Sequence, residues 1–263
     1  MTGPSRSRGD GLTEYSGAGD PRRSIELLWG TAAPARRGPK AKFTVAGVTS
    51  VAIALADAEG LAAVSMRRVA EQLGVTAMSL YTYVPSKAEL LDVMIDTVSA
   101  EAVRPAFTGS GWRERLTEIA ATNWALYRRH PWLLQIATSR PVLGPNVIAK
   151  YDFELRAFES CVVPDVDADL LLSLVLNYVA GAVRAAVQAD QAEQSTGMSE
   201  EQWWGAYAPL LGEVLDPARF PTAARVGQAA GEEYGAGDPV RAYEFGLERV
   251  LDGIDAHLGR LRQ

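Results

Sequence analysis

Hydrophobic residues recur at three- and four-residue intervals along most of the chain from Phe43 onward, without the strict alternation that is typical of β-strands. This interval matches an α-helix, in which residues three or four apart share one face. Clusters of proline and glycine, such as "SRPVLGPN" and "EEYGAGDP", separate the helical segments. The pattern therefore predicts an all-α fold.

Four helices are expected between residues 43 and 104. The first spans residues 44–60 and the second residues 65–74, and each starts at a hydroxyl residue that can cap the helix and stops at a glycine. A fourth begins at Ser86, whose spacing to Glu89 predicts a capping box. The short third helix, in "GVTAMSLYTYVPSK", is nearly uncharged where a surface helix usually carries Lys or Glu.

Longer helices are expected in the rest of the chain, at residues 112–129, from 132, and at 146–161, 165–189, 199–215 and 240–261. The helix at 165–189 is apolar nearly all round, so both of its faces must be covered. The last helix places a single stripe on one face, namely Tyr243, Leu247, Val250, Ile254 and Leu258. Two strongly apolar helices suggest a partner beyond the chain's own core.

The second and third helices meet the physical requirements of a helix-turn-helix. Ala70 is small where the two helices approach, and Gly74 can take the left-handed conformation that the turn needs. On a helical wheel Leu80 and Val84 face the core, whereas hydroxyl, methyl and aromatic groups face outward. Such a face suits the DNA major groove, where hydroxyls reach base edges or phosphates and apolar groups pack on thymine methyls.

Cationic residues flank this short helix. Arg67 and Arg68, in the first turn of the second helix, could reach a guanine edge and a phosphate, and Lys87 could reach a backbone phosphate. The alternative is an ordinary helical hairpin in which Tyr81 and Tyr83 are half-buried packing residues.

Residues 1–41 are rich in Gly, Pro, Ser and Arg, which predicts a flexible arm. The arm leads into the first helix through "ARRGPKAK". Two interpretations stay open for its cations: a minor-groove contact next to the helix-turn-helix, or a solvated linker. The cations concerned are Arg36, Arg37, Lys40 and Lys42.

Charge is unevenly divided along the chain, whose net charge is −6. Residues 1–104 hold 12 Lys/Arg and 11 Asp/Glu, a net of +1, whereas residues 105–263 hold 14 and 21, a net of −7. A modestly basic part that can approach phosphates is thus joined to an acidic body that would not.

The longest apolar run, residues 169–183, is too short for a bilayer, and no N-terminal stretch resembles a signal peptide, so a cytoplasmic protein outside the membrane is expected.

Residues 43–104, above all "SMRRVAEQLGVTAMSLYTYVPSKAELLDVM", closely resemble the DNA-binding domain of the TetR family of transcriptional repressors. The stretches "SRPVLGPN" and "YEFGLERVLDGI" look like the tetracycline-repressor type of ligand-binding domain. The resemblance places the family's base- and phosphate-contacting positions on Arg67, Thr76, Ala77, Met78, Ser79, Tyr81, Tyr83 and Lys87.

The resemblance also implies an organisation in three parts: a flexible basic arm (1–41), a helix-turn-helix domain with its connector helix (42–104), and a ligand-binding and dimerisation domain (105–263). Helices 165–189 and 240–261 would form a four-helix bundle with their copies in a second subunit. The homodimer would present two recognition helices to a palindromic operator in double-stranded DNA and would respond to a small-molecule inducer.

Polar residues interrupt the apolar faces of the helices at 112–129 and 165–189, and buried amides need partners that a ligand can supply. Aromatic residues follow the same stretches, which suggests a pocket for a sizeable apolar or aromatic molecule. The candidate lining residues are Asn123, Trp124, Tyr127, Trp132, Asn177, Tyr178, Gln188 and Trp204. Ordinary core aromatics and intersubunit amides are the alternative.

No metal or other cofactor is expected. Tetracycline-responsive members of the family hold a magnesium chelate through histidines, and the corresponding stretches here, "DTVSAEAVRP" and "LLQIATSRP", contain none. His130 and His257 lie at or near helix C-termini and are interpreted as structural.

The expected function is a ligand-responsive transcriptional repressor without catalytic activity. A dimeric DNA-binding regulator without an inducer is the alternative. An enzyme is disfavoured because the sequence offers no Cys–His pair, metal-ligand spacing or glycine-rich phosphate loop.

Overall fold

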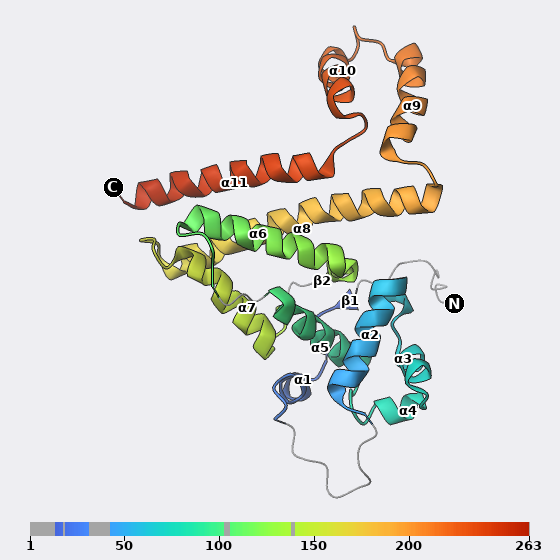
Figure 1. Cartoon of the computed structure of the whole chain (residues 1–263), viewed down its shortest axis with the longest axis vertical. Helices are drawn as coiled ribbons and strands as arrows, with labels where there is room; N and C mark the ends of the chain where they lie inside the picture. The colour runs from blue at the N-terminus through green and yellow to red at the C-terminus, as the bar shows by residue number, and fades with distance from the viewer. Residues whose placement is uncertain (1–13, 18, 32–42, 103–105, 138–139, 263) are drawn as a thin grey trace, which may run out of the picture. The chain divides into compact units, whose positions relative to one another are not determined.

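The computed structural model describes residues 14–17, 19–31, 43–102, 106–137 and 140–262. Over these residues the regular secondary structure is helical apart from two short strands, β1 (Glu14–Tyr15) and β2 (Ile136–Ala137), which pair in parallel (Figure 1). The prediction of an all-α fold is therefore confirmed.

The chain divides into two compact units. The first unit comprises residues 1–107 and 125–156, and the second unit comprises residues 108–124 and 157–263. The predicted domain boundary at residue 104 lies near the first of these divisions. The first unit is nevertheless larger than the predicted DNA-binding domain, because residues 125–156 pack with it.

The first unit is built from helices that pack around α5. In chain order they are α1 (Pro21–Leu28), α2 (Val45–Glu59), α3 (Met66–Leu73), α4 (Ala77–Leu80), α5 (Lys87–Ser99), the C-terminal part of α6 (Trp112–Arg129) and α7 (Pro145–Leu155), with the 3₁₀ turns η1 (Leu61–Ala63), η2 (Ala100–Ala102) and η3 (Pro131–Gln135).

Capping residues explain where the first of these helices begin and end. Thr44 Oγ1 accepts the Gly47 N–H at 3.1 Å, and Ser65 Oγ accepts the Arg68 N–H at 3.2 Å. Gly60 ends α2 with a φ of 82°, which an L-residue rarely adopts. The predicted bounds of these helices are therefore confirmed by their local chemistry.

Helix α5 is the centre of the first unit, and ten of its 13 residues are buried. It contacts α1, α2 and α7, and Leu90, Leu91 and Met94 form part of the hydrophobic core. Three carboxylates, Glu89, Asp92 and Asp96, are buried on the same helix. Because a buried carboxylate requires hydrogen-bond donors, these three residues anchor the segments that cross α5.

The predicted capping box at the start of α5 is wrong. Ser86 Oγ accepts the Ala88 N–H at 3.1 Å, as an N-cap does. The Glu89 carboxylate, however, accepts from the Ser86 hydroxyl and from the backbone N–H of Asp20, the latter at 3.1 Å. The segment before α1 thus supplies the partner that the capping box would have found in the Ser86 backbone.

In residues 14–17 and 19–31, which the structure describes, the chain forms a capped helix and contacts the core, in place of the predicted flexible arm. Helix α1 is capped by Asp20, which accepts the Arg23 N–H at 2.9 Å, and Leu27 and Leu28 pack against the core. The Gly17 N–H donates to Asp92 Oδ1 at 2.9 Å, and Trp29 Nε1 donates to the Leu143 carbonyl at 2.9 Å. We call residues 14–31 the N-terminal strap.

Asp96 binds the other side of α5 to α7. Its Oδ1 accepts the backbone N–H groups of Asn146 at 2.9 Å and Val147 at 3.0 Å, and its Oδ2 accepts from the Asn146 side chain at 2.9 Å. Gly144 precedes α7 without a capping side chain of its own. A carboxylate from a different helix therefore caps α7.

The second unit contains the N-terminal part of α6 together with α8 (Asp165–Thr196), α9 (Glu200–Val214), α10 (Pro221–Tyr234) and α11 (Pro239–Leu261). Helices α8 and α11 run alongside each other (Figure 1). The predicted stripe of the last helix is buried at Leu247, Ile254 and Leu258, with Leu251 in place of Val250. This stripe therefore packs within the chain. Helix α10 was not predicted.

Helix α8 is longer than predicted, since it continues to Thr196. Among the described residues it is the one helix with the length and composition of a membrane span, and 28% of its most apolar window is buried. By length and composition alone this helix could therefore span a bilayer, which the sequence did not indicate, although the core helix of a soluble protein passes the same test. Val166, Leu170 and Leu174, spaced four apart, are exposed by 70%, 60% and 48%, so one face of α8 remains uncovered in the single chain.

Candidate nucleic-acid interface and ligand site

The turn between α3 and α4 has the geometry of a Schellman motif. Gly74 adopts φ 66° and ψ 37°, the left-handed conformation, and its N–H donates to the Glu71 carbonyl at 3.1 Å. The Val75 N–H reaches back to the Ala70 carbonyl at 3.0 Å. Ala70 and Leu80 are fully buried between the helices. The predicted helix-turn-helix is therefore present, with the glycine in the predicted role.

Helix α4 exposes a face of mixed chemistry. Met78 is 76% exposed and Tyr81 is 45% exposed, and Thr76 and Ser79 are exposed beside them. The Thr76 and Ser79 hydroxyls lie 3.0 Å apart, so each can donate to the other or to a ligand. These four predicted DNA-contacting residues lie together on one surface, which we call the α4 face.

Ala77 and Tyr83 differ from the other predicted contacts on this helix. Both are partly buried and pack against the core of the first unit. The packing interpretation that the sequence left open thus fits Tyr83, whereas Tyr81 projects outward.

The two arginines of α3 are engaged in ion pairs. Arg67 Nε lies 2.8 Å from Glu71 Oε1, in an exposed pair one turn apart. Arg68 donates from both terminal nitrogens to the Glu59 carboxylate, at 2.8 and 2.9 Å, and this contact lowers the pKa of Glu59. The structure therefore gives Arg68 a protein partner instead of the predicted open phosphate contact, because Glu59 at the end of α2 lies beside the start of α3.

The remaining predicted DNA contacts fall in two groups. Lys87 is the first residue of α5 and is half-buried. Arg36, Arg37, Lys40 and Lys42 lie outside the described residues.

Trp124, Tyr178 and Tyr243 form an aromatic cluster in the second unit, and the first two are predicted ligand residues. The rings of Trp124 and Tyr243 lie 4.2 Å apart, and the rings of Tyr178 and Tyr243 lie 6.3 Å apart. The Tyr178 hydroxyl donates to the backbone carbonyls of Ala242 at 3.0 Å and Tyr243 at 2.9 Å. Burial, together with the neighbouring Tyr178, raises the pKa of Tyr243 to about 12, so its phenol remains a neutral hydrogen-bonding group.

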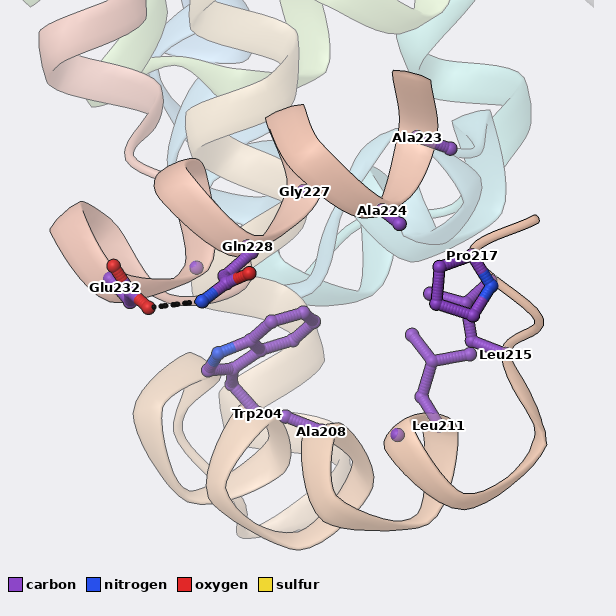
Figure 2. A pocket seen from close by; sticks show the side chains of 12 residues that line it. Trp204, Ala208, Leu211, Leu215, Pro217, Ala223, Ala224, Gly227, Gln228 and Glu232 are labelled. Carbon is purple, nitrogen blue, oxygen red and sulfur yellow. Dashed lines mark hydrogen bonds between the residues drawn. The ribbon is translucent and has the colours of Figure 1, made fainter. Parts of the chain in front are cut away.

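The predicted ligand residues of the second unit line three different hollows. Asn177 and Tyr178 border a hollow of about 430 Å³ between α8 and α11, and Gln188 borders a neighbouring one of about 300 Å³. Trp204 borders a third, of about 470 Å³, between α9 and α10 (Figure 2). Asn123 is buried within α6, where its Nδ2 donates to the Ile119 carbonyl at 2.9 Å. These residues therefore do not line one common pocket.

Trp132 and Tyr127 belong to the first unit. Trp132 is 1% exposed, and its indole N–H donates to Asp57 Oδ1 at 2.7 Å. Its indole is thus fixed in the core of the first unit by a carboxylate of α2, and its role as a ligand contact stays a prediction.

Asp57 also contacts His130 Nδ1 at 2.7 Å, and His130 Nε2 lies 3.3 Å from Glu101 Oε2. Since His130 is buried, its contacts with two elements fit the structural interpretation. His257 Nε2 lies 3.0 Å from Asp167 Oδ2. No group of three or more His, Cys, Asp or Glu side chains that could hold a metal ion occurs within the described ranges.

Sequence reasoning missed two features of this region. Tyr243 was assigned to a packing stripe, although it bridges Trp124 and Tyr178. The α10 wall of the third hollow was not foreseen, and the only signal for it was the Gly- and Ala-rich composition of "TAARVGQAAGEEYG".

Comparison with known proteins finds a matching family for the N-terminal part of the chain and another for the C-terminal part. Residues 48–94 match the family described as "Bacterial regulatory proteins, tetR family". Residues 104–258 match the family described as "Tetracyclin repressor-like, C-terminal domain". The HTH-type transcriptional repressor DrrR1 of Streptomyces coeruleorubidus is 41% identical over 253 residues, covering 96% of this chain and 92% of the relative.

Solved structures with the same fold include ActR of Streptomyces coelicolor. Apo ActR aligns with a TM-score of 0.67 at 26% identity, covering 86% of this chain and 99% of ActR. ActR in complex with actinorhodin aligns with a TM-score of 0.68 at 27% identity, covering 82% of this chain and 97% of ActR.

Proposed function

Because the chain belongs to the TetR family of bacterial transcriptional regulators, we propose that it is a ligand-responsive repressor that binds a palindromic operator as a homodimer. A small apolar or aromatic molecule would release it from the operator. We further propose that it acts in the cytoplasm, outside any membrane, and without catalytic activity of its own.

The observation that carries the proposal is the α4 face. An uncharged surface of hydroxyls, a thioether and a phenol follows a left-handed glycine turn, and it is exposed although it is partly apolar. In a major groove these groups have partners: the hydroxyls can bond base edges or phosphates, and Met78 can pack on thymine methyls. Arg67 and Lys87 would then supply the attraction for phosphates.

The uncovered stripe on α8 supports a dimer. Val166, Leu170 and Leu174 expose apolar surface at helical spacing, as expected of an interface that a second copy covers. Leu170→Asp would place a charge in that interface, and the protein should become monomeric by light scattering. Val226→Asp, at an exposed position on α10, is the matched control and should leave the dimer intact.

Operator binding is tested by selecting bound sequences from a random DNA pool and measuring fluorescence anisotropy on the recovered sites. Recovered sites should be palindromic, with half-sites that fit two recognition helices on one face of the DNA. Recovery of single, unpaired half-sites would contradict binding as a dimer.

Ligand response is tested first with actinorhodin, because the related ActR has been solved with that compound. Thermodynamic linkage requires that operator weakens ligand binding by the same factor by which ligand weakens operator binding. Equal ligand affinity with and without operator would exclude release by that ligand. A dimer that binds its operator and responds to no compound would be the regulator without an inducer.

A further inference from the structure

The second unit contains an apolar hollow of about 470 Å³ between α9 and α10 (Figure 2). Its volume lies within the range of about 300–1,000 Å³ that is usual for small-molecule sites. Helix α9 and its C-cap contribute larger side chains, and α10 contributes small residues opposite them. The principal lining residues are Trp204, Leu211 and Leu215 on one wall, and Ala224, Gly227 and Gly231 on the other.

Two glycines of α10 give this hollow its shape. A Cβ at Gly231 would lie 2.7 Å from Trp204 Cζ2, so the indole lies directly against the backbone of α10. A Cβ at Gly227 would meet no atom within 4 Å, so the space one turn away is open. The result is a slot with an indole at one end and apolar walls, which suits a planar aromatic ring because such rings stack on one another.

The polar groups of the slot favour a cation. Gln228 Nε2 donates to Glu232 Oε1 at 2.9 Å at the edge of the hollow. Glu232 is the one charged residue among those that line it. The neighbouring Glu233 is paired with Arg241 at 2.8 Å, whereas no described Lys or Arg forms such a pair with Glu232. An unbalanced carboxylate and an indole face both attract a positive charge.

From these contacts we infer that the α9–α10 slot binds a planar aromatic molecule that carries an amine, with its ring beside Trp204 and its cationic group near Glu232. This inference deepens the proposed function and rests on it for one consequence only, that occupation of the slot releases the operator. Binding itself needs no DNA.

The binding test uses the full chain without DNA and two probes of the same shape. 1-Naphthylmethylamine is cationic at neutral pH, and 1-naphthoate is anionic. Affinity is measured by calorimetry, and the site is located by the indole resonance of Trp204, which is assigned with Trp204→Phe. The amine should bind at least about fivefold more tightly than the naphthoate and should shift the Trp204 resonance, because the lining charge is negative.

Two glycine variants test the location. Gly227→Leu fills the open part of the slot and should weaken binding of the amine at least about tenfold, since its side chain occupies the ligand's volume. Gly205→Leu is the control: Gly205 lies in α9, also meets no atom within 4 Å of an added Cβ, and does not line the slot. Both changes favour a helix, so both variants should fold. Gly205→Leu should bind as the wild type does.

Glu232→Gln tests the charge and should reduce the preference for the amine over the naphthoate to less than about twofold. The inference is overturned if the amine leaves the Trp204 resonance unchanged, if the two glycine variants bind equally, or if the naphthoate binds as tightly as the amine. A slot filled by a second copy of the chain would give the first of these results.

Operator release separates this inference from the proposed function. If the amine releases operator from the wild type and from Gly227→Leu at the same concentration, release does not pass through the slot; this result overturns that one consequence of the inference and leaves the proposed function intact. Conversely, the expected pattern of amine binding with no release of operator by any compound would remove the proposed function, while the slot would remain a binding site.

Discussion

Deleting residues 1–31 should destabilise the protein severely, although the composition of this stretch suggests a dispensable tail. The deletion removes the N-terminal strap and keeps the four cations at residues 36–42, so the charge next to the DNA-binding domain is preserved. Deletion of residues 1–13 is the matched control, because it ends where the described part of the strap begins.

The magnitude follows from the hydrogen bonds that the strap makes. Asp92 loses the Gly17 N–H at 2.9 Å and Glu89 loses the Asp20 N–H at 3.1 Å. A hydrogen bond to a charged group contributes about 1.5–3 kcal/mol, and an ordinary one about 0.5–1.5 kcal/mol. The two carboxylate bonds, with the bond from Trp29 to Leu143 at 2.9 Å, therefore give a loss of about 4–7 kcal/mol. A whole domain has about 5–15 kcal/mol of stability.

The assay is thermal unfolding at pH 7, followed by far-ultraviolet circular dichroism, since the deletion also removes a tryptophan. A loss of this size should lower the midpoint by at least about 8 °C, because 1 kcal/mol shifts Tm by about 2–4 °C in a protein of this size. Deletion of residues 1–13 should leave the midpoint within about 2 °C. Equal midpoints for the two deletions would refute the reasoning and restore the interpretation of residues 14–31 as an arm.

Four further predictions concern the first unit. Asp96→Ala should cost about 3 kcal/mol in urea unfolding because two backbone N–H groups of α7 lose their acceptor, and Asp96→Asn should cost less because one acceptor remains. Burial raises the pKa of Asp92, so its contribution to stability is greatest when it is protonated, near and below pH 4, and is lost as the pH rises through the raised value. Asp92→Asn should therefore gain stability relative to the wild type as the pH rises from 4 to 7. Urea titrations at several pH values measure this difference, and a difference that stays constant with pH would contradict the prediction. Glu59→Gln should free Arg68, tighten operator binding and steepen its salt dependence by about one counterion, whereas unchanged anisotropy curves would leave Arg68 a purely structural residue. Tyr81→Ala should relax sequence preference in the selected DNA pool more than it lowers non-specific affinity, and the opposite pattern would assign Tyr81 to the backbone.

The sequence predicted those parts of the fold that depend on neighbours along the chain. Thr44 and Ser65 cap helices whose N–H groups lie three residues later, and Gly74 ends α3 through bonds to carbonyls within the same turn. Chemistry of this kind can be read from spacing alone, because all the partners lie within about one helical turn.

Contacts between distant residues could not be predicted in the same way. Residues 14–31 resemble a disordered tail in composition, and they are ordered by carboxylates about 70 residues away on α5. The Glu59 partner of Arg68 and the Asp57 partner of Trp132 likewise come from another helix. A helical wheel gives the face on which a residue lies, but the residue that meets it depends on how the helices pack.

The unpredictability of contacts between distant residues also explains why the ligand site was predicted only in part. Asn177, Gln188 and Trp204 are polar or aromatic interruptions of helical patterns, and each does border a hollow. The sequence indicated that such positions need partners, but α10 has few large apolar side chains that would have marked it as the second wall of a slot. Its small residues are informative only when Trp204 is seen against them.

The buried carboxylates of α5 also constrain how a ligand could act on DNA binding. Glu89 and Asp92 join this helix to the N-terminal strap, and Asp96 joins it to the start of α7. An allosteric coupling free energy is about 1–3 kcal/mol, which is no larger than the cost of about 1.5–3 kcal/mol for breaking one of these charged hydrogen bonds. If ligand binding broke these hydrogen bonds, the cost of breaking them would cancel the coupling free energy available to weaken DNA binding. Helix α5 must therefore move together with the strap and the start of α7, as one block, if its movement is to separate the two recognition helices of a dimer.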